Sequence, residues 1–374
     1  MSRSIHRKVR LVRSAIKKLK LDLEGETVYT EAATGNFAVT APIAAAAGAE
    51  NVFALAKDSP YGTAAEAKSQ IEALARRLSV SESITFVTEK QPEQVRQASI
   101  ITNTGFVRPI DAQFVDWMNP NAVVALMYEP WEFRDADIDI RACWNAGIPV
   151  LGTDESNAQI ATQSYLPHLV SKLSFEHDIE VFSCNYVIVG NGSFAEHAVS
   201  GLSNMGADVT LIAPEPRSEF IANRRDCSSF ESTTSIEALS QADVLVVLDH
   251  GTDAEIIGPD GYISAARLTE CNESLVLVHI CGNVDKAALE DAETEVVPQE
   301  PAPAGHMSYT LGYLGPKPVV DLHAGGLKVG ELGTNAQRKK RGLSTIIELV
   351  TSSSVAADFP TAFKEAYDFE SYVD

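Results

Sequence analysis

Short apolar runs alternate with stretches of helical periodicity along most of the chain. Between the runs, apolar residues recur every three or four positions, which is the spacing of one face of a helix. Helices are expected at 38–48 and 63–78. Strands alternating with helices predict a parallel α/β sheet with helices on both faces. The strands expected in this first half are 27–30, 51–55, 83–87, 99–102, 122–126 and 150–152.

The second half repeats the pattern after a linking helix expected at 157–173. The proline-rich stretch 298–318 predicts a loop, and 342–357 predicts one more helix. The fold class is therefore α/β, with two Rossmann-like parallel-sheet domains. The strands expected in this half are 186–189, 209–212, 244–248, 275–280 and 319–322.

The most specific local pattern lies at 187–206, where a strand stops at Gly190-Asn-Gly192 and a helix follows at once. Gly190 is expected to allow a tight turn, and Gly192 to let the backbone approach a pyrophosphate. The helix N-terminus, with Ser193 and Phe194, would direct amide donors and a positive dipole end toward that anion. Strand, glycine turn, helix and strand together predict a bound dinucleotide.

Composition narrows the class of protein. A length of 374 residues suggests two domains, and a net charge of −21 argues against nucleic acid as a partner. The five cysteines form no CxxC pair, which predicts a reducing compartment, no disulfide framework and no metal site. The apolar runs are all shorter than the ~18 residues of a membrane span, and a secretory signal is not recognisable. We therefore expect a cytoplasmic protein.

The N-terminus differs from the rest of the chain. Residues 1–20 hold eight Lys or Arg and no acid, and Val9, Val12, Ile16 and Leu19 share one helical face. This basic amphipathic arm, taken as 1–24, could bind an anionic membrane or a partner, or direct import into an organelle. Alternatively it docks on the acidic body of its own chain or of a dimer mate. Docking is favoured because the remainder supplies so much negative charge.

A collinear series of short marks extends over residues 95–340. In order and spacing the series resembles the D-isomer-specific 2-hydroxyacid dehydrogenases. The resemblance implies a substrate domain at 25–156 plus 330–374, an inserted dinucleotide-binding domain at 157–329, and a cleft between them. The marks are Pro109-Ile-Asp111, Ile138-Asp-Ile140, Ala146-Gly-Ile-Pro-Val150, Ser156–Ala158, the glycine loop, Gly282 with Val284-Asp285, Glu300-Pro301 and His323-Ala-Gly-Gly326.

The resemblance also implies catalytic roles. A histidine in that family moves the proton of the substrate oxygen, and His323 has this place, with Glu300 as the carboxylate that tunes it. Hydride transfer to a carbonyl leaves an alkoxide, so a general acid with a pKa near neutrality is needed. Asp249 and Cys281, at the ends of two strands, are expected beside the cofactor.

One departure is at the family's substrate-binding arginine, whose position holds Cys281. A thiol cannot supply the charged fork that anchors a carboxylate. Either Arg134, Arg108 or Lys328 takes over the anchoring, or the substrate is not a simple 2-hydroxy acid. Cys281 itself is either a reactive thiol or, as is commoner, a buried structural cysteine.

A second departure is in the loop 128–134, where the family offers a glycine-rich turn to the substrate carboxylate. Here Glu129 and Glu132 would repel a carboxylate, and the proline between them removes an amide donor. Trp131 and Phe133 would form an apolar wall of the substrate site, or simply pack at a domain interface.

The choice of nicotinamide cofactor depends on the end of the strand 209–212. NAD sites place an acid there, but this chain has Ala213, followed by Glu215 and Arg217. With Arg224 and Arg225 also near, a 2′-phosphate could be accommodated, although Glu215 could reach the ribose and the arginines could merely be solvated. NADP(H) is slightly favoured over NAD(H).

Three functions fit these features. The first is an NAD(P)-dependent oxidoreductase acting on a small oxo or hydroxy substrate, with His323 as its acid/base. The second is a catalytically silent dinucleotide-binding regulator or partner-binding protein, which the missing arginine favours. The third is a hydrolase or lyase that retains NAD as a transient oxidant. A homodimer is expected by resemblance.

Overall fold

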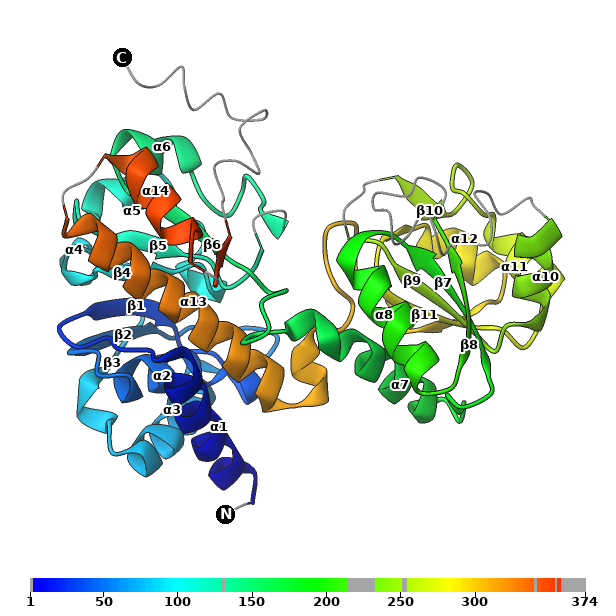
Figure 1. Ribbon diagram of the computed structural model, residues 1–374, viewed down its shortest axis with the longest axis horizontal. Coiled ribbons are helices and arrows are strands. Elements are labelled where there is room, and N and C mark those ends of the chain that lie inside the picture. The colour runs from blue at the N-terminus through cyan, green and yellow to red at the C-terminus, as the bar shows by residue number, and fades with distance from the viewer. Residues whose placement is uncertain are drawn as a thin grey trace. The chain divides into compact units, whose positions relative to one another are not determined.

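The computed structural model describes residues 3–129, 132–213, 233–250, 254–339, 342–353 and 355–357. The chain divides into two compact units (Figure 1): unit 1 is Met1–Thr162 with Gly315–Asp374, and unit 2 is Gln163–Leu314. Unit 2 is thus an insertion in unit 1. The N-terminal arm belongs to unit 1, and the chain returns to that unit at Gly315, so the expected return at residue 330 lies inside a helix.

Unit 1 is built on a seven-stranded sheet in the order β14-β6-β5-β4-β1-β2-β3. All neighbours are parallel except β14, which runs antiparallel to β6. Val28 of β1 lies opposite both Val52 and Ile100, so the strand order reverses at β1. Ligands of such sheets bind at this switch point, beyond the carboxyl ends of the strands. We call this side of a sheet its carboxyl edge. The strands are β1 (Thr27–Glu31), β2 (Asn51–Leu55), β3 (Ile84–Val87), β4 (Ile100–Thr102), β5 (Val123–Ala125), β6 (Val150–Thr153) and β14 (Ala356–Ala357).

Helices cover both faces of this sheet, as the alternating pattern predicts. Helix α3 shows how local sequence sets the bounds: the Thr63 hydroxyl accepts from the Glu66 amide at 3.2 Å, and the Glu66 carboxylate accepts from the Thr63 amide at 2.8 Å. The helices of unit 1 are α1 (Arg3–Leu19), α2 (Thr40–Ala46), α3 (Ala64–Leu78), α4 (Pro92–Gln97), α5 (Ala112–Trp117), α6 (Ile140–Asn145), α13 (Pro316–Gln337) and α14 (Leu343–Thr351).

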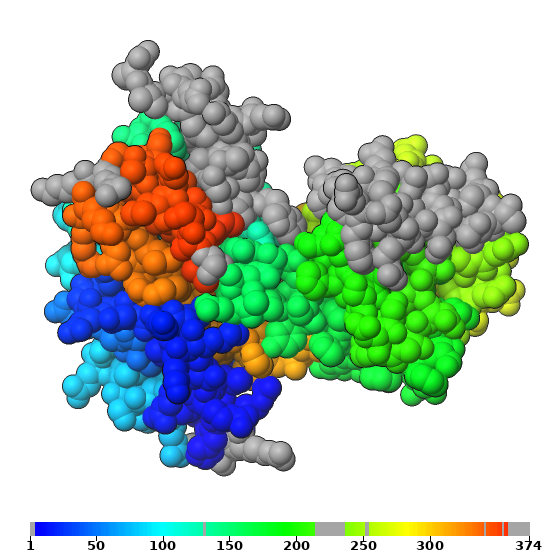
Figure 2. All heavy atoms as spheres, in the orientation of Figure 1, coloured from blue at the N-terminus to red at the C-terminus, as the bar shows by residue number. Residues whose placement is uncertain are grey.

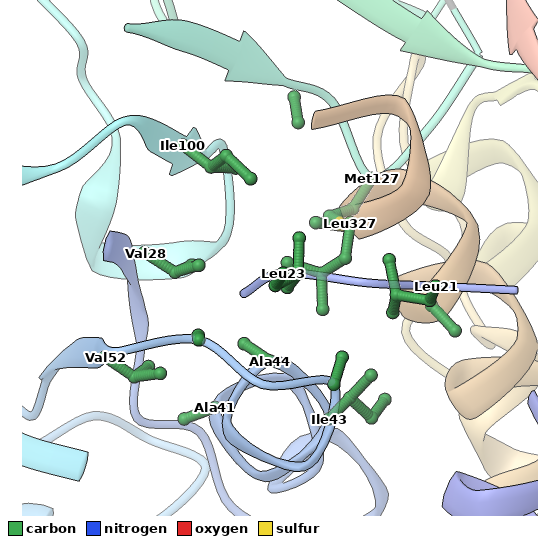
Figure 3. Packing of buried hydrophobic residues seen from close by; sticks show 14 of the residues in the cluster. Leu21, Leu23, Val28, Ala41, Ile43, Ala44, Val52, Ile100, Met127 and Leu327 are labelled. Atoms are coloured by element: carbon green, nitrogen blue, oxygen red, sulfur yellow. The ribbon is translucent and has the colours of Figure 1, made fainter. Parts of the chain in front are cut away.

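Helix α1 forms an additional layer over the alanine-rich helix α2. Val12, Ala15 and Leu19 of α1 are buried, and α1 contacts α13, α3 and α2. Beneath it α2 is buried, and Ala44 of α2 faces Leu23 in the close view (Figure 3). The apolar face of α1 is therefore occupied by its own unit, while most of its basic residues are exposed. The N-terminal segment, in blue, lies on the surface of that unit (Figure 2).

The prediction of a strand at 319–322 is wrong, because these residues belong to helix α13. An apolar run of four residues reads alike in a buried strand and a buried helix. Glycines at the spacing i, i+4 and i+7 let α13 lie close against the sheet. A Cβ at Gly326 would meet Met127 Sδ at 2.2 Å, at Gly330 it would meet Ile100 Cγ2 at 2.7 Å, and at Gly333 Leu151 Cδ1 at 2.7 Å.

The predicted loop and helix at the end of the chain also change. The loop expected at 298–318 gives way to a 3-10 turn, η6 (Leu311–Leu314), and then to α13. The helix expected at 342–357 ends at Thr351, and Ala356–Ala357 pairs with β6 instead. Local periodicity does not show the sheet edge that captures these last residues.

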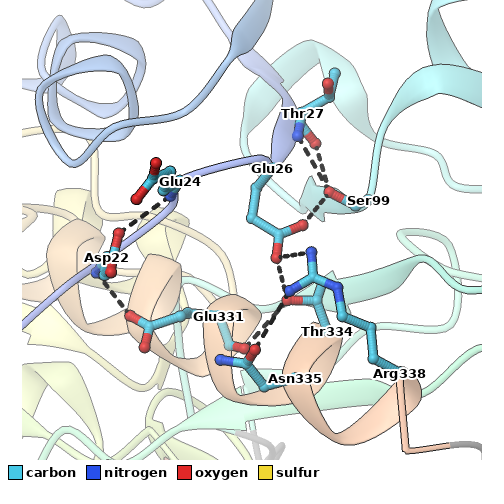
Figure 4. A network of polar contacts seen from close by, with 9 residues as sticks. All are labelled: Asp22, Glu24, Glu26, Thr27, Ser99, Glu331, Thr334, Asn335 and Arg338. Carbon is cyan, nitrogen blue, oxygen red and sulfur yellow. Dashed lines mark hydrogen bonds and ion pairs between the residues drawn. The ribbon is translucent and has the colours of Figure 1, made fainter.

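A buried carboxylate fastens α13 to the start of the sheet. The Glu26 carboxylate accepts from the Ser99 hydroxyl at 2.6 Å and from the Thr334 hydroxyl at 2.9 Å, and it pairs with Arg338 (Figure 4). Glu26 precedes β1 and Ser99 precedes β4, while Thr334 and Arg338 lie at the end of α13. The network joins the two stretches of chain that make up unit 1, Met1–Thr162 and Gly315–Asp374.

Unit 2 contains a five-stranded parallel sheet in the order β13-β11-β9-β7-β8. Its first helix, α7, lies beside η6, where Lys172 Nζ donates to the Tyr313 carbonyl at 2.9 Å. None of the helices in the described residues of either unit is long and apolar enough to cross a membrane. The elements of unit 2 are α7 (Leu166–Glu176), β7 (Asn185–Gly190), α8 (Gly192–Asn204), β8 (Asp208–Ile212), α10 (Thr233–Gln241), β9 (Val244–Leu248), β10 (Glu255–Ile257), α11 (Ala265–Cys271), β11 (Val276–Cys281), β12 (Asn283–Val284), α12 (Lys286–Asp291) and β13 (Glu295–Val297).

Candidate functional site

The glycine loop lies at the switch point of unit 2, because β7 pairs with β8 on one side and with β9 on the other. Gly190 ends β7, and a Cβ there would lie 2.1 Å from the carbonyl oxygen of Leu248 in β9. Gly190 is therefore required because β7 and β9 approach each other closely at this point. The sequence pattern predicts a different reason for this glycine, a tight turn. Gly192 has a φ of +64°, and a Cβ there would have no atom within 4 Å.

Helix α8 begins at Gly192 and presents its N-terminus at the carboxyl edge of unit 2. The Ser193 carbonyl is bonded by His197, and the Phe194 ring is buried against His250, with ring centroids 5.7 Å apart. Phe194 therefore anchors the helix. An open glycine at the positive end of a helix fits the pyrophosphate of a dinucleotide.

The adenosine side of such a ligand would lie beyond β8. Ala213 follows that strand, is buried, and offers no carboxylate to a ribose. Arg217, Arg224 and Arg225, with Glu215, lie outside the described residues. On the other side of the switch point, the Asp249 amide donates to the Cys281 carbonyl at 3.0 Å.

Cys281 ends β11 and is fully buried in the core of unit 2. Two residues earlier lies a group that the sequence pattern does not reveal, the imidazole of His279. Its Nδ1 lies 2.6 Å from the Ser308 hydroxyl and its Nε2 lies 2.9 Å from the Gly282 carbonyl. Burial lowers the pKa of His279, against the opposing effect of the Gly282 bond. A histidine within an apolar run is the only trace of this site in the sequence.

Glu300, the expected partner of the catalytic histidine, belongs to unit 2 and pairs with Lys286 there. Its side chain is 80% exposed. Within unit 2, the Glu300 carboxylate is therefore paired with Lys286, whereas the resemblance implies that it tunes the catalytic histidine.

His323 belongs to unit 1, in the second turn of α13. Its Nδ1 lies 2.5 Å from the hydroxyl of Thr40, the first residue of α2, and its ring packs near Phe37. Burial lowers the pKa of His323 to about 4. This pKa is below the near-neutral value expected from the sequence. The imidazole is therefore neutral at pH 7, and a neutral imidazole accepts a proton more readily than it gives one.

The carboxyl edge of unit 1 brings several polar groups near its switch point. Arg108, after β4, pairs with Asp137 at 2.9 Å. Burial raises the pKa of Glu31, at the end of β1, against the opposing effects of the Phe106 amide and the Arg108 charge. The Asn103 side chain accepts from the Met127 amide at 2.8 Å, which ties the loop after β5 to the end of β4.

Three carboxyl groups hold the loop after β5. The Glu129 carboxylate accepts from the Glu155 amide at 2.9 Å, and Glu132 bonds the Glu129 amide at 3.2 Å. Burial raises the pKa of Glu129 and of Glu132 to about 7, and it raises the pKa of Glu155 well above its ordinary value. These carboxyl groups therefore hold the loop through hydrogen bonds. At pH 7 they carry less negative charge than three fully ionised glutamates would.

The remaining substrate-site candidates are distributed unevenly. Arg134 lies beside Glu132, and Phe133 packs on the core beneath the loop, whereas Trp131 lies outside the described residues. Lys328 donates to the Glu331 carboxylate and to the carbonyl of Lys20, a residue that precedes β1. Lys328 therefore lies toward the amino ends of the strands, away from the carboxyl edge. Among the described residues, no three His, Cys, Asp or Glu side chains gather in a way that could hold a metal ion.

Comparisons with known proteins bear on both units. Residues 179–286 match the family model described as putative NAD(P)-binding, which includes the glycine loop and Cys281. A search of curated proteins finds no match. The structure is similar to a dipicolinate synthase protein from Bacillus halodurans, with a TM-score of 0.52 and 12% identity over 81% of this chain and 96% of that one.

Two further solved structures match. A dipicolinate synthase protein from Bacillus subtilis gives a TM-score of 0.53 at 13% identity, covering 85% of this chain and 99% of that one. A putative D-isomer-specific 2-hydroxyacid dehydrogenase from Polaromonas sp., of the family that the sequence marks resemble, gives 0.45 at 14% identity, covering 78% and 98%. The likeness to the two Bacillus proteins concerns the fold, and it agrees with the predicted pair of α/β domains.

Proposed function

We propose, from the match of residues 179–286 to a putative NAD(P)-binding family, that the protein is an NAD(P)-dependent oxidoreductase acting on a small oxo or hydroxy substrate. The observation that carries the proposal is the cradle at the switch point of unit 2. Gly190 lets β7 and β9 approach, and Gly192 leaves open space at the N-terminus of α8. These residues would hold the pyrophosphate, and the bound nicotinamide would accept or supply the hydride.

In this proposal His323 is the proton acceptor for the substrate hydroxyl. The Thr40 bond occupies Nδ1 and fixes the ring, so Nε2 is the nitrogen assigned to the substrate. Because burial lowers the pKa of His323 to about 4, the ring is neutral at pH 7, which is the form that can take a proton, but it is a weak base until that pKa is raised. Glu300 remains the proposed partner that would stabilise the protonated ring.

The substrate would bind at the carboxyl edge of unit 1. Arg134 and Arg108 are its proposed anchors, and Trp131 and Phe133 its apolar wall, whereas Cys281, expected there as well, is buried in the core of unit 2 and is not part of this proposal. Each arginine has an acidic neighbour, Glu132 or Asp137, which weakens its pull on a substrate carboxylate. We therefore infer a substrate other than a standard 2-hydroxy acid.

The finer features of the proposal are the cofactor preference and the assembly. NADP(H) is proposed over NAD(H), since Ala213 supplies no carboxylate to the ribose and Arg217 follows. A homodimer acting in the cytoplasm is proposed as well. Parallel titrations with NADH and NADPH, and sedimentation of the purified chain, test these points.

The central test combines cofactor binding with turnover. Gly192→Val fills the cradle and is expected to abolish binding of both cofactors, while His323→Gln is expected to bind normally and to lose about a hundredfold in turnover on a panel of carbonyl compounds and alcohols. His306→Gln, an exposed histidine, serves as control. Normal turnover in His323→Gln would remove that residue from the mechanism.

A catalytically silent dinucleotide-binding protein is the second candidate. The buried thiol of Cys281 favours it, because that position would carry the substrate-binding arginine in the family that the sequence resembles. It predicts that the wild-type chain binds cofactor but turns over no member of the panel. A third candidate, the NAD-retaining hydrolase or lyase, predicts cofactor that survives dialysis.

A further inference from the structure

We propose that His279 is a positioning residue for the nicotinamide half of the cofactor; the inference rests on the proposed function of unit 2. A histidine at the end of a strand whose other residues are apolar needs a reason. Val278, His279 and Ile280 are all fully buried, and an apolar side chain could fill the same space. The polar bonds of the imidazole are therefore what distinguishes this position.

The place of His279 follows from how a dinucleotide crosses a doubly wound sheet. The pyrophosphate lies at the glycine loop after β7, and the adenosine half extends over the end of the next strand, β8. The nicotinamide half must then extend in the other direction, over the ends of β9 and β11. His279 and Cys281 belong to that end of β11.

The hydrogen bonds of His279 form a relay with one direction. A carbonyl can only accept, so Nε2 carries the proton and donates to Gly282, at 2.9 Å. The other nitrogen, Nδ1, then accepts from the Ser308 hydroxyl at 2.6 Å. The Ser308 oxygen accepts in turn from the Ala302 amide at 2.9 Å. The lowered pKa of His279 keeps the ring in this neutral form.

The relay fastens the proline-rich segment across the end of β11. The Ser308 amide donates to the Ile280 carbonyl at 2.8 Å, and Met307 forms a bridge with Cys281. On the other side of the ring, Gly282 has a φ of +133°, and its Cβ would meet Ile256 Cδ1 at 2.7 Å. The imidazole thus holds both segments that follow the nicotinamide end of the strand.

The experiment compares two ligands that differ only in the nicotinamide. Binding of NADH and of ADP-ribose is measured by calorimetry for the wild-type chain, Ser308→Ala and His279→Gln. Gln can keep the bond to Gly282 but not the bond to Ser308, and Ser308→Ala leaves the imidazole in place. We expect both variants to weaken NADH about tenfold, the equivalent of one lost hydrogen bond, and to leave ADP-ribose within about twofold.

A pH series adds a readout that a merely structural role would not move. Protonation of Nδ1 removes the acceptor for Ser308, so the wild-type preference for NADH over ADP-ribose is expected to fall on acidification. In Ser308→Ala that preference is expected to be already low and flat. His306→Gln, in the same segment but exposed, is the matched control and should behave as wild type.

The outcomes separate the inference from the proposed function. Equal weakening of both ligands in Ser308→Ala, or no change in either, overturns the positioning role while the cofactor site stands. A wild-type chain that binds neither of these ligands, and no NADPH in the parallel titration, overturns the proposed function and the inference with it. Because Ser308→Ala removes a single hydroxyl, it keeps the test available should His279→Gln fail to fold.

Discussion

Replacing Glu26 with glutamine is expected to lower the free energy of unfolding of unit 1 by about 2 kcal/mol. The side chain is 2% exposed, and its two oxygens accept from Ser99, Thr334 and Arg338. Glutamine has the same volume but only one accepting oxygen, so at least one donor loses its partner. A hydrogen bond to a charged group contributes about 1.5–3 kcal/mol.

Two details place the effect at the lower end of that range. The Ser99 hydroxyl has a second acceptor in the Thr27 carbonyl at 3.2 Å, and the Thr334 hydroxyl has one in the Glu331 carbonyl at 3.1 Å. The Arg338 side chain is 53% exposed, so water screens its pairing, which contributes at most about 1 kcal/mol.

Urea unfolding followed by tryptophan fluorescence measures this change in one unit. The three tryptophans of the chain, Trp117, Trp131 and Trp144, all belong to unit 1. Glu24→Gln is the matched control, since its exposed carboxylate lies in the same segment and its loss should change stability by less than about 0.5 kcal/mol. A Glu26→Gln variant as stable as the control would refute the reasoning that α13 is fastened through this carboxylate.

Three further predictions concern other parts of the molecule. Gly190→Ala places a Cβ against the Leu248 carbonyl and is expected to destabilise unit 2 by about 1–3 kcal/mol and to abolish cofactor binding, as measured by calorimetry. His323 binds a proton near its ordinary pKa of 6.5 in the unfolded chain but only near 4 in the folded one. The free energy of unfolding of unit 1 should therefore decrease by up to about 3 kcal/mol as the pH falls from about 6.5 to about 4, and His323→Gln should flatten that dependence. Leu19→Asp removes the apolar contact of α1 and should destabilise unit 1 by at least about 3 kcal/mol; a stable variant would show that α1 is dispensable.

Strands β1 to β9 and β11 could be predicted because each is a short apolar run between turn residues, whereas β13 and β14 were not expected. Helix α13 could not, because its apolar start resembles a strand and its glycines lower helix propensity. Those glycines are understandable only once the sheet beneath them is known, since Gly326 and Gly333 are needed where Met127 and Leu151 approach. Contacts between distant segments decide such elements.

The same limit applies to the candidate site. Gly190 and Gly192 form a local pattern and were recognisable, although the Leu248 carbonyl that requires Gly190 comes from another strand. His279 and Ser308 are far apart in the sequence, and neither belongs to a pattern that predicts their bond. Lys328 looked available as an anchor because its bonds to Glu331 and to the Lys20 carbonyl depend on how α13 packs.

The pairing of α7 with η6 has a practical consequence for dissecting the molecule. These are the first and last segments of unit 2, and Lys172 joins them through the Tyr313 carbonyl and lies 3.8 Å from the centre of its ring. An inserted module whose two ends meet can be excised without pulling its chain apart. Residues 163–314 are therefore expected to fold when expressed alone, and the proposed cofactor affinity can then be measured without any contribution from unit 1.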